Sequence, residues 1–286
     1  MDKNVKNSFV IPVLSIIIPC YNHGLYIKEA LQSVALCTDT ALYEIIIIND
    51  GSTDEHTVQV LHELEREGYN IIHQTNLGLG AARNNAIKAA RGKYILPLDC
   101  DNRIRPEYIY EGINVLNNHL GVAVVYGDAE YFGEKKGRWI VGPFNLQNLM
   151  LNNYIDACAV FRKSVWENLN GYDVHMPIMG YEDWDLWLRF ALAGQHFYYI
   201  NKVLFDYRVL SASMSNSNGT PESLALSAYM DEKYKDYLGK KYVEQTLIKN
   251  LKENKKLILK LYLRAFHPGI INYFIRKKKI VNDSIL

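Results

Sequence analysis

The chain has 286 residues, of which 49% are hydrophobic and 22% charged, and its formal net charge at pH 7 is +1. This length and composition exclude disorder over most of the chain and can bury a substantial core in one large domain, or in one domain with an appendage. The near-neutral balance hides an asymmetry. Residues 249–286 hold ten Lys and Arg against two acidic residues, about +8, which leaves about −7 for the rest.

The cysteines and the N-terminus are typical of a protein from a reducing compartment. The four cysteines show no CxxC spacing, which argues against a disulfide framework and against a zinc site: Cys20, Cys37, Cys100 and Cys158. The first 22 residues contain one short apolar run with a proline, which is typical of a buried strand and not of a signal peptide. We therefore expect a cytoplasmic protein.

Apolar segments of strand length alternate with segments of helical periodicity through the first hundred residues. The pattern predicts strands over 13–19, 43–50, 70–74 and 93–99, separated by helices over 25–36, 57–67 and 79–90. The run IIII at 45–48 is β-branched and apolar on both faces, as in a central parallel strand that helices cover on both sides. The sequence predicts an α/β fold with a mostly parallel sheet flanked by helices.

Polar side chains follow three of these strands, at 19–22, 49–54 and 99–102. In open α/β sheets, ligands bind outside the carboxyl ends of the strands. The segment NDGSTD is by itself equally typical of a turn and helix cap, with Ser52 or Thr53 as the capping residue. Three such clusters in succession favour a ligand cleft.

The segment LDCDN places Asp99 and Asp101 one residue apart at the end of a strand. Two such carboxylates repel each other unless a cation or ligand lies between them. Mg²⁺ and Mn²⁺ prefer oxygen ligands and are typically held by one or two carboxylates together with substrate phosphates. Phosphatases that use a nucleophilic DxD place it on the first strand and continue DxDGT, whereas this motif lies near residue 100 and continues Asn102-Arg103.

A second acidic cluster opens the predicted helix in GYEDWDLWLRF, where Glu182, Asp183 and Asp185 fall in the first turn. Acidic residues at this position are also favoured by the helix dipole alone. Trp184 and Trp187 occupy apolar positions and are expected to pack in the core and not on a sugar ring.

Four segments, in this order, resemble the inverting glycosyltransferases of family 2, which have a GT-A fold: SIIIPCYNHGLYIKEALQSV, EIIIINDGSTDEH, NLGLGAARNNAIKAARGKYILPLDCDN and GYEDWDLWLRFALAG. The resemblance covers roughly residues 12–210. It implies a GT-A domain over 1–215, with a nucleotide-binding half at about 12–102 and an acceptor half at about 103–215. A basic helical extension follows over 216–286.

The resemblance also implies roles for individual residues. The nucleotide sugar would be bound by Pro19, Tyr21, Asp50, Arg83 and Asp99. Asp101 would ligate Mn²⁺ or Mg²⁺ at the diphosphate, and Asp183 would be the general base that deprotonates the acceptor hydroxyl, a mechanism that needs no protein nucleophile. Acceptor contacts would come from Asn153, Asp156 and Glu182. For Arg83 the residues alone also allow a helix-surface arginine that pairs with a neighbour.

The chain departs from the family pattern after the sheet. Many relatives carry a histidine in a YRxH pattern near the metal or diphosphate, whereas this chain has Leu210 in YRVL. The third metal ligand is therefore open, with Arg208 or the Ser-rich segment 211–223 as the alternatives.

The expected function is transfer of a sugar, most plausibly from a UDP-sugar, to a hydroxyl of a glycan or lipid-linked acceptor in bacterial surface polysaccharide assembly. The alternative is a non-catalytic sugar-nucleotide-binding protein with the same fold. A nucleotidyltransferase would carry a GxGxR-type loop after the first strand, and CYNHGLY is not one. The basic tail is interrupted by charges and Pro268, which disfavours a membrane-spanning helix. It fits peripheral contact with anionic lipid or a helical cap with a solvated basic face. No nucleic-acid partner is expected.

Overall fold

The computed structural model describes residues 11–210, 221–238, 259 and 262–263. The strands are β1 Leu14–Cys20, β2 Tyr43–Asp50, β3 Asn70–Gln74, β4 Tyr94–Pro97, β5 Arg103–Ile104, β6 Val122–Gly133, β7 Gly137–Trp139, β8 Val160–Arg162 and β9 His196–Val209. The helices are α1 Gly24–Ala35, α2 Glu55–Arg66, α3 Leu79–Ala89, α4 Pro106–Asn118, α5 Leu146–Leu151, α6 Lys163–Asn168, α7 Glu182–Leu192, α8 Pro221–Lys233 and α9 Lys235–Leu238.

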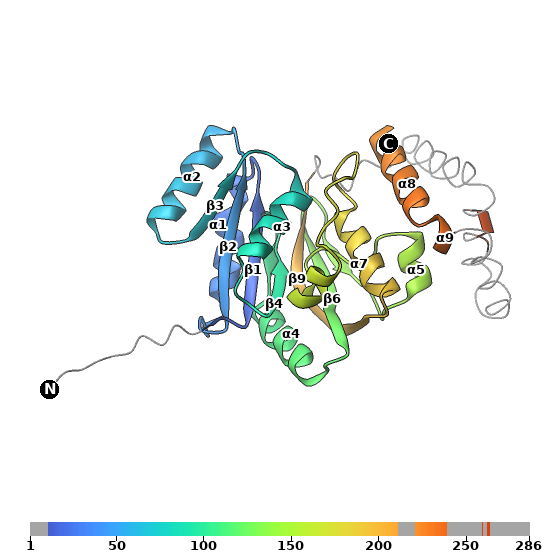
Figure 1. The fold of residues 1–286 in the computed structure, drawn as a ribbon. Coiled ribbons are helices and arrows are strands. Elements are labelled where there is room, and N and C mark those ends of the chain that lie inside the picture. Colours follow the sequence, from blue (N-terminus) through green and yellow to red (C-terminus); the bar gives the residue numbers. More distant parts are fainter. Residues whose placement is uncertain (1–10, 211–220, 239–258, 260–261, 264–286) are drawn as a thin grey trace.

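The nine strands of the described residues join one sheet in the order β3-β2-β1-β4-β8-β6-β9-β5, with β7 paired to β6. Figure 1 shows β1 to β4, β6 and β9 of this sheet. The long pairings, of β1 with β2 and β4, of β2 with β3 and of β6 with β9, are parallel. The short strand β8 is antiparallel to both β4 and β6 and connects the two parallel parts. The prediction of a mostly parallel α/β sheet flanked by helices is confirmed, and the β-α alternation of the first hundred residues lies where it was predicted.

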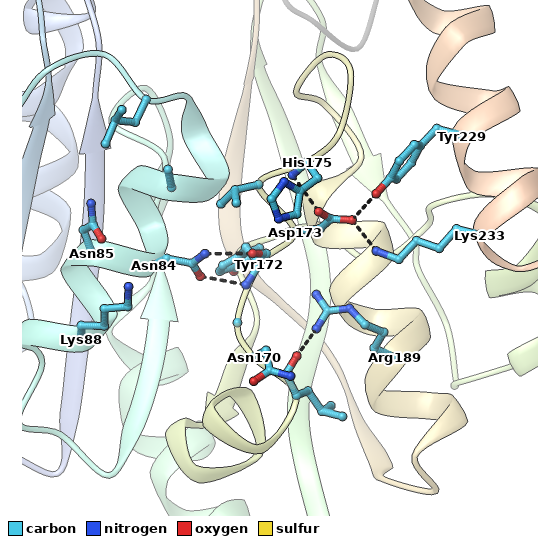
Figure 2. A pocket seen from close by; sticks show the side chains of 15 residues that line it. Asn84, Asn85, Lys88, Asn170, Tyr172, Asp173, His175, Arg189, Tyr229 and Lys233 are labelled. Carbon is cyan, nitrogen blue, oxygen red and sulfur yellow. Dashed lines mark hydrogen bonds and ion pairs between the residues drawn. The ribbon is translucent and has the colours of Figure 1, made fainter.

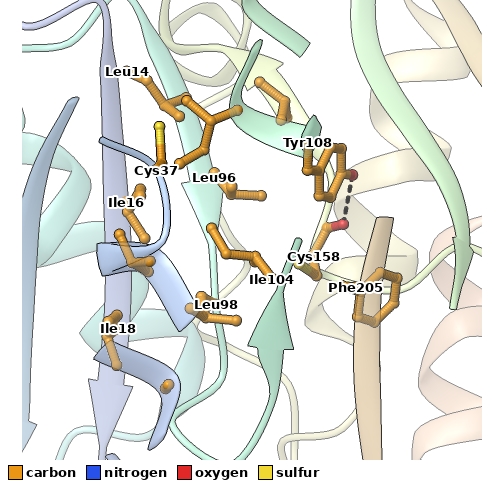
Figure 3. Packing of buried hydrophobic residues seen from close by; sticks show 14 of the residues in the cluster. Leu14, Ile16, Ile18, Cys37, Leu96, Leu98, Ile104, Tyr108, Cys158 and Phe205 are labelled. Atoms are coloured by element: carbon orange, nitrogen blue, oxygen red, sulfur yellow. Dashed lines mark hydrogen bonds between the residues drawn. The ribbon is translucent and has the colours of Figure 1, made fainter. Parts of the chain in front are cut away.

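Alternate residues of each strand point to opposite sides of the sheet. Both sets are largely apolar, so helices cover both faces of the sheet. Along β1, Leu14, Ile16 and Ile18 belong to the core beneath α1 and α4, while Ile17 faces the second core beneath α3 and α7. Figure 3 shows the first of these cores, in which the β1 side chains pack against Leu96 and other apolar residues. Burial on both faces explains why the strands are apolar without alternation.

The cap of α2 differs from the prediction. Neither Ser52 nor Thr53 is the N-cap, because the carboxylate of Asp54 accepts hydrogen bonds from the backbone N and the hydroxyl of Thr57, both at 2.7 Å. Thr53 N instead donates to Oδ1 of Asn22 over 2.8 Å, and Asn22 has a positive φ of 55°, which asparagine tolerates better than most residues. The turn after β1 and the loop after β2 are thereby fastened together.

Among the described residues, no helix combines the length and the apolar composition needed to cross a bilayer. The predicted basic tail lies almost entirely outside the described residues.

Candidate active site

The polar strand ends come together at one edge of the sheet. Cys20 and Asn49 are partners in the register of β1 and β2, and β4 pairs with β1 on its other side. Asp50 therefore ends a strand at the same edge at which Asp99 and Asp101 follow β4. This convergence is what the sequence predicted for a ligand cleft.

Asp50 is buried and organises the loop between β3 and α3. Its carboxylate accepts hydrogen bonds from Nε2 of Gln74 at 2.7 Å, from the backbone N of Leu77 at 2.8 Å and from that of Gly78 at 3.0 Å. Tyr21 is exposed beside this edge, whereas Pro19 is part of buried β1. Contact of these residues with a nucleobase stays a prediction.

Arg83 connects the two acidic clusters. Its Nη2 lies 2.6 Å from Oδ1 of Asp99, and its Nη1 lies 2.9 Å from Oε1 of Glu182. The alternative of a helix-surface arginine is wrong, because only 1% of this residue is exposed. Burial alone would disfavour the cation, but the negative charges of Asp99 and Glu182 outweigh it and raise the pKa of Arg83. One buried cation thus serves both carboxylate sites.

Glu182 lies inside the protein at the start of α7. Its second oxygen, Oε2, accepts a hydrogen bond from the backbone N of Gly180 at 2.8 Å, so both carboxylate oxygens have partners. A contact between Glu182 and an acceptor stays a prediction, and it would require one of these partners to be exchanged.

Asp183 is 8% exposed, and each of its carboxylate oxygens accepts one hydrogen bond. Oδ2 accepts from Nδ2 of Asn153 at 2.8 Å, and Oδ1 accepts from the backbone N of Trp184 at 2.7 Å. Burial, and next the charge of Glu182, raise the pKa of Asp183 to about 8, although Arg83 acts in the opposite direction. A carboxyl with such a pKa can take up and release a proton near neutral pH.

Asp185, the third acidic residue of the cluster, has a different environment. It is fully buried, pairs with Nη2 of Arg189 at 2.7 Å and Nζ of Lys233 at 2.6 Å, and accepts a hydrogen bond from the hydroxyl of Tyr234 at 2.6 Å. These contacts join α7 to α8. Trp184 and Trp187 are buried in the core, as predicted.

Asp156 also faces the charged cluster. Its carboxylate accepts a hydrogen bond from the backbone N of Cys158 at 2.8 Å. Burial, and next the negative charge of Asp99, raise the pKa of Asp156 to about 7. Asn153 and Asp156 therefore lie with the two acidic clusters, as their predicted role requires, while contact with an acceptor stays a prediction.

Three buried polar atoms around Arg83 have no hydrogen-bond partner among the described residues: Nε of Arg83, Oδ1 of Asn153 and the hydroxyl of Tyr172. The Tyr172 ring centroid lies 5.6 Å from Cζ of Arg83. Buried polar groups in folded proteins are normally hydrogen-bonded, so unsatisfied atoms grouped in this way mark a place that water or a ligand completes.

The DxD pair suits a divalent cation. Burial, and next the charge of Asp99, raise the pKa of Asp101 to about 6, so a cation here would offset an existing repulsion. Within the described part of the chain, no three His, Cys, Asp or Glu side chains are set to hold a metal by themselves. Oxygen ligands from one or two carboxylates plus substrate phosphates nevertheless fit Mg²⁺ or Mn²⁺.

A surface hollow of about 660 Å³ lies between α3, residues 169–175, α7 and α8 (Figure 2). It is lined by Asn84, Asn85, Lys88 and other residues, but by none of the carboxylates of the two clusters described above. At its α8 side, Asp173 accepts a hydrogen bond from the hydroxyl of Tyr229 at 2.7 Å and pairs with Lys233. These contacts fasten α8 to the rest of the molecule. The predicted domain boundary near residue 215 stays a prediction.

Comparison with known proteins agrees with this geometry. The family model described as Glycosyl transferase family 2 matches residues 15–169. An uncharacterized glycosyltransferase of Rickettsia prowazekii is 30% identical over an alignment of 225 residues that covers 74% of this chain and 69% of that protein. The chondroitin synthase of Escherichia coli is 30% identical over an alignment of 210 residues that covers 70% of this chain and only 29% of that enzyme.

Solved structures of low sequence identity share the fold. S. aureus TarS 1-349 in complex with UDP-GlcNAc matches with a TM-score of 0.60 at 19% identity, over 86% of this chain and 69% of that one. The mannosyltransferase PcManGT from Pyrobaculum calidifontis, in complex with GDP-Man and Mn2+, matches with a TM-score of 0.56 at 15% identity, over 89% and 69%. The sheet with its flanking helices is thus a GT-A fold, and the chain belongs to glycosyltransferase family 2.

Proposed function

We propose that this protein is an inverting, cation-dependent glycosyltransferase that moves a sugar from a UDP-sugar to a hydroxyl of a glycan or lipid-linked acceptor. One observation carries the proposal: Asp183, a buried carboxyl of raised pKa, is connected through Glu182 and Arg83 to the DxD aspartate Asp99. A structural neighbour solved with UDP-GlcNAc and another solved with GDP-Man and Mn2+ support a nucleotide-sugar donor and a divalent cation.

Asp183 is assigned the role of general base. It removes the proton from the acceptor hydroxyl while that oxygen forms the new bond to the anomeric carbon and the bond from this carbon to the diphosphate oxygen breaks. The incoming oxygen attacks opposite the leaving diphosphate, so the configuration inverts and no protein nucleophile is needed. Hydrogen bonds from Asn153 and from the Trp184 backbone hold the carboxylate in one orientation.

The donor side is assigned to the three strand ends. Asp50, with Pro19 and Tyr21, would face the nucleobase, Asp99 would bind the nucleotide sugar, and Asp101 would hold Mn²⁺ or Mg²⁺. When bound, the cation neutralises charge on the departing nucleoside diphosphate. Arg83, which is buried behind Asp99, would act by fixing that carboxylate.

The setting we propose is polysaccharide assembly at the inner face of a bacterial membrane. The Escherichia coli chondroitin synthase supports a glycan acceptor, although the chain aligns with only 29% of that enzyme. The basic segment 249–286 would contact the membrane surface.

A thermal-shift comparison of UDP, UDP-GlcNAc and GDP-mannose, each with and without Mn²⁺, tests the donor. A ligand at a hundred times its dissociation constant adds about 2.7 kcal/mol to the free energy of unfolding. We expect stabilisation by UDP and its sugar, increased by Mn²⁺. Absence of any shift would contradict the proposal. Stabilisation without release of UDP in the presence of a pool of glycan acceptors would favour the non-catalytic alternative.

A further inference from the structure

Arg208, near the end of β9, fastens the turn that carries the DxD pair. Its backbone N donates a hydrogen bond to Oδ1 of Asn102 over 2.8 Å, and its Nε donates to the backbone carbonyl of Asp101 over 2.8 Å. Two consecutive residues of the turn are therefore held by one residue that lies 107 positions later in the chain.

The Arg208 side chain is itself fixed from several directions. Its Nη2 pairs with Glu29 of α1. Its Cζ lies 4.2 Å from the ring centroid of Phe132 in β6 and 4.7 Å from that of Tyr26 in α1. Only 13% of the side chain is exposed. A guanidinium stacked on two rings and held by a carboxylate has little freedom, so it can act as a rigid attachment point.

The Asp101 carboxylate has few partners: its own backbone N–H donates a hydrogen bond to it, and the positive charge of Arg208 attracts it. Its direction depends on the backbone of the turn, and this backbone is the part that Arg208 holds. Asn102, the second residue of the attachment, is 2% exposed, so the attachment lies in the interior and not at a mobile surface.

We propose that Arg208 is a positioning residue of the donor site: it holds the backbone at Asp101 and Asn102 in the arrangement in which the Asp101 carboxylate would hold a divalent cation. The inference rests on the proposed function. It also removes Arg208 as a candidate for the third metal ligand, because a guanidinium has no acceptor atom and cannot bind a metal. Arg208 acts on the proposed cation site through the backbone of the turn. It lies close in sequence to Leu210, which stands where the family pattern has a histidine.

Calorimetric titration of the full-length protein with UDP, with and without Mn²⁺, tests the inference. The variants are Arg208→Met, which removes the guanidinium but keeps an apolar stem against the two rings, and Arg208→Lys, which keeps the charge but not the fork. Arg105→Met is the matched control, because Arg105 pairs with Asp206 of the same strand at 2.9 Å and with Glu130, and it makes no contact with the DxD turn.

We expect Mn²⁺ to strengthen UDP binding in the wild type and in Arg105→Met. In Arg208→Met this strengthening should fall about tenfold or more, as for the loss of a charged hydrogen-bond donor, while UDP binding without metal stays the same. Melting temperatures of the two methionine variants should fall by similar amounts. Such a pattern separates positioning of the cation site from general stabilisation of β9.

Full strengthening by Mn²⁺ in Arg208→Met would overturn the inference, and so would an equal loss in Arg105→Met. If Arg208→Met does not fold, Arg208→Lys decides in the same way: a loss supports the inference and wild-type behaviour overturns it. If the wild type itself shows no response to Mn²⁺, the proposed cation dependence fails and this inference fails with it. A responsive wild type with a responsive Arg208→Met refutes this inference alone.

Discussion

The raised pKa of Asp183 has opposite effects on protein stability and on the chemistry proposed for this side chain. Burial and the neighbouring charge of Glu182 disfavour its ionised form, and the pKa rises to about 8. A general base works best when its pKa lies near the working pH, because a carboxylate with an ordinary pKa of about 3.9 would hold the acceptor's proton too weakly. In the proposed role of general base, the raised pKa strengthens Asp183 as a base and destabilises its ionised state.

Replacing Asp183 with Asn tests its role in transfer. Asparagine keeps the shape but lacks the basic oxygen, so we expect the chemical step to slow by roughly 10² to 10⁴-fold. UDP binding in the presence of Mn²⁺ should persist. In the wild type, kcat/KM should rise with pH through about 8 as Asp183 loses its proton, and this dependence should vanish in the variant. Near-normal transfer by the variant, measured per folded molecule, would remove Asp183 as the base.

The pH dependence of stability tests the raised pKa without any substrate. The folded protein binds the Asp183 proton more tightly than the unfolded chain, whose carboxyl titrates near pH 4, as is typical of aspartate (about 3.9). The contribution of this group to the free energy of unfolding therefore falls as pH rises from about 4 to about 8, and then stays level. Urea denaturation should show Asp183→Asn gaining on the wild type across this window. A constant difference between pH 5 and pH 9 would mean that the pKa is not raised.

The sequence predicted Asp99 and Asp101 as site residues because they follow a strand, and Asp183 because it begins a helix. All three also lie in the family motifs. It could not show that Arg83 joins Asp99 to Glu182, since these partners lie 16 and 99 residues away and no periodicity connects them. The same limit applies to Arg208, whose hydrogen-bond partners Asp101 and Asn102 lie 107 and 106 residues earlier in the chain. Long-range ion pairs follow from tertiary packing and leave no local pattern.

At the scale of elements, one lysine of α8 lies between two carboxylates of the sheet domain and adds to the hydrogen bond from Tyr229 to Asp173. Lys233 pairs with Asp173 and with Asp185, which is fully buried. Burial is the largest single influence on Asp173 and by itself would raise its pKa. The hydrogen bond from Lys233 and further donors together outweigh burial and lower the pKa to about 2. Removal of the lysine leaves two carboxylates close together without their shared cation.

Lys233→Met should therefore lower the free energy of unfolding by roughly 2–3 kcal/mol. Lys235→Met is the control, because Lys235 pairs with Glu232 on the surface, where both side chains are mostly exposed, and its loss should leave stability nearly unchanged. Urea denaturation measures both. Equal effects would show that Lys233 is not an attachment point of α8.

The β-α alternation of the first hundred residues was predictable because each element is long and has one clear period. The order and direction of the strands in the middle of the sheet were not predictable. Strand β8 has only three residues, Val160–Arg162, and it pairs antiparallel with strands that precede it in the chain. A segment of that length has no readable period, and its place in the sheet is decided by packing against β4 and β6.

At the scale of the whole molecule, charge is unevenly distributed along the chain. The basic excess of residues 249–286 stands against an acidic remainder. If this segment contacts anionic lipid, the protein should float with vesicles that contain phosphatidylserine, and binding should weaken as salt screens the attraction. Replacing Lys277, Lys278 and Lys279 with glutamate should abolish flotation. Equal flotation of both proteins, or equal binding to neutral vesicles, would contradict membrane contact through these charges.

Because Arg83 pairs with both Asp99 and Glu182, we expect the proposed donor and acceptor sides to be thermodynamically linked. A single guanidinium divides its field between Asp99 and Glu182, so neutralising either carboxylate changes what the other experiences. Kinetic effects of Asp99→Asn and Glu182→Gln should accordingly be non-additive in a double-mutant cycle of transfer rates, and additive effects would show the two sides to be independent. By the same reciprocity, a substitution of Asp99 should also change the proton affinity of Asp183, which lies far from Asp99 in the sequence but is connected to it through Arg83 and Glu182.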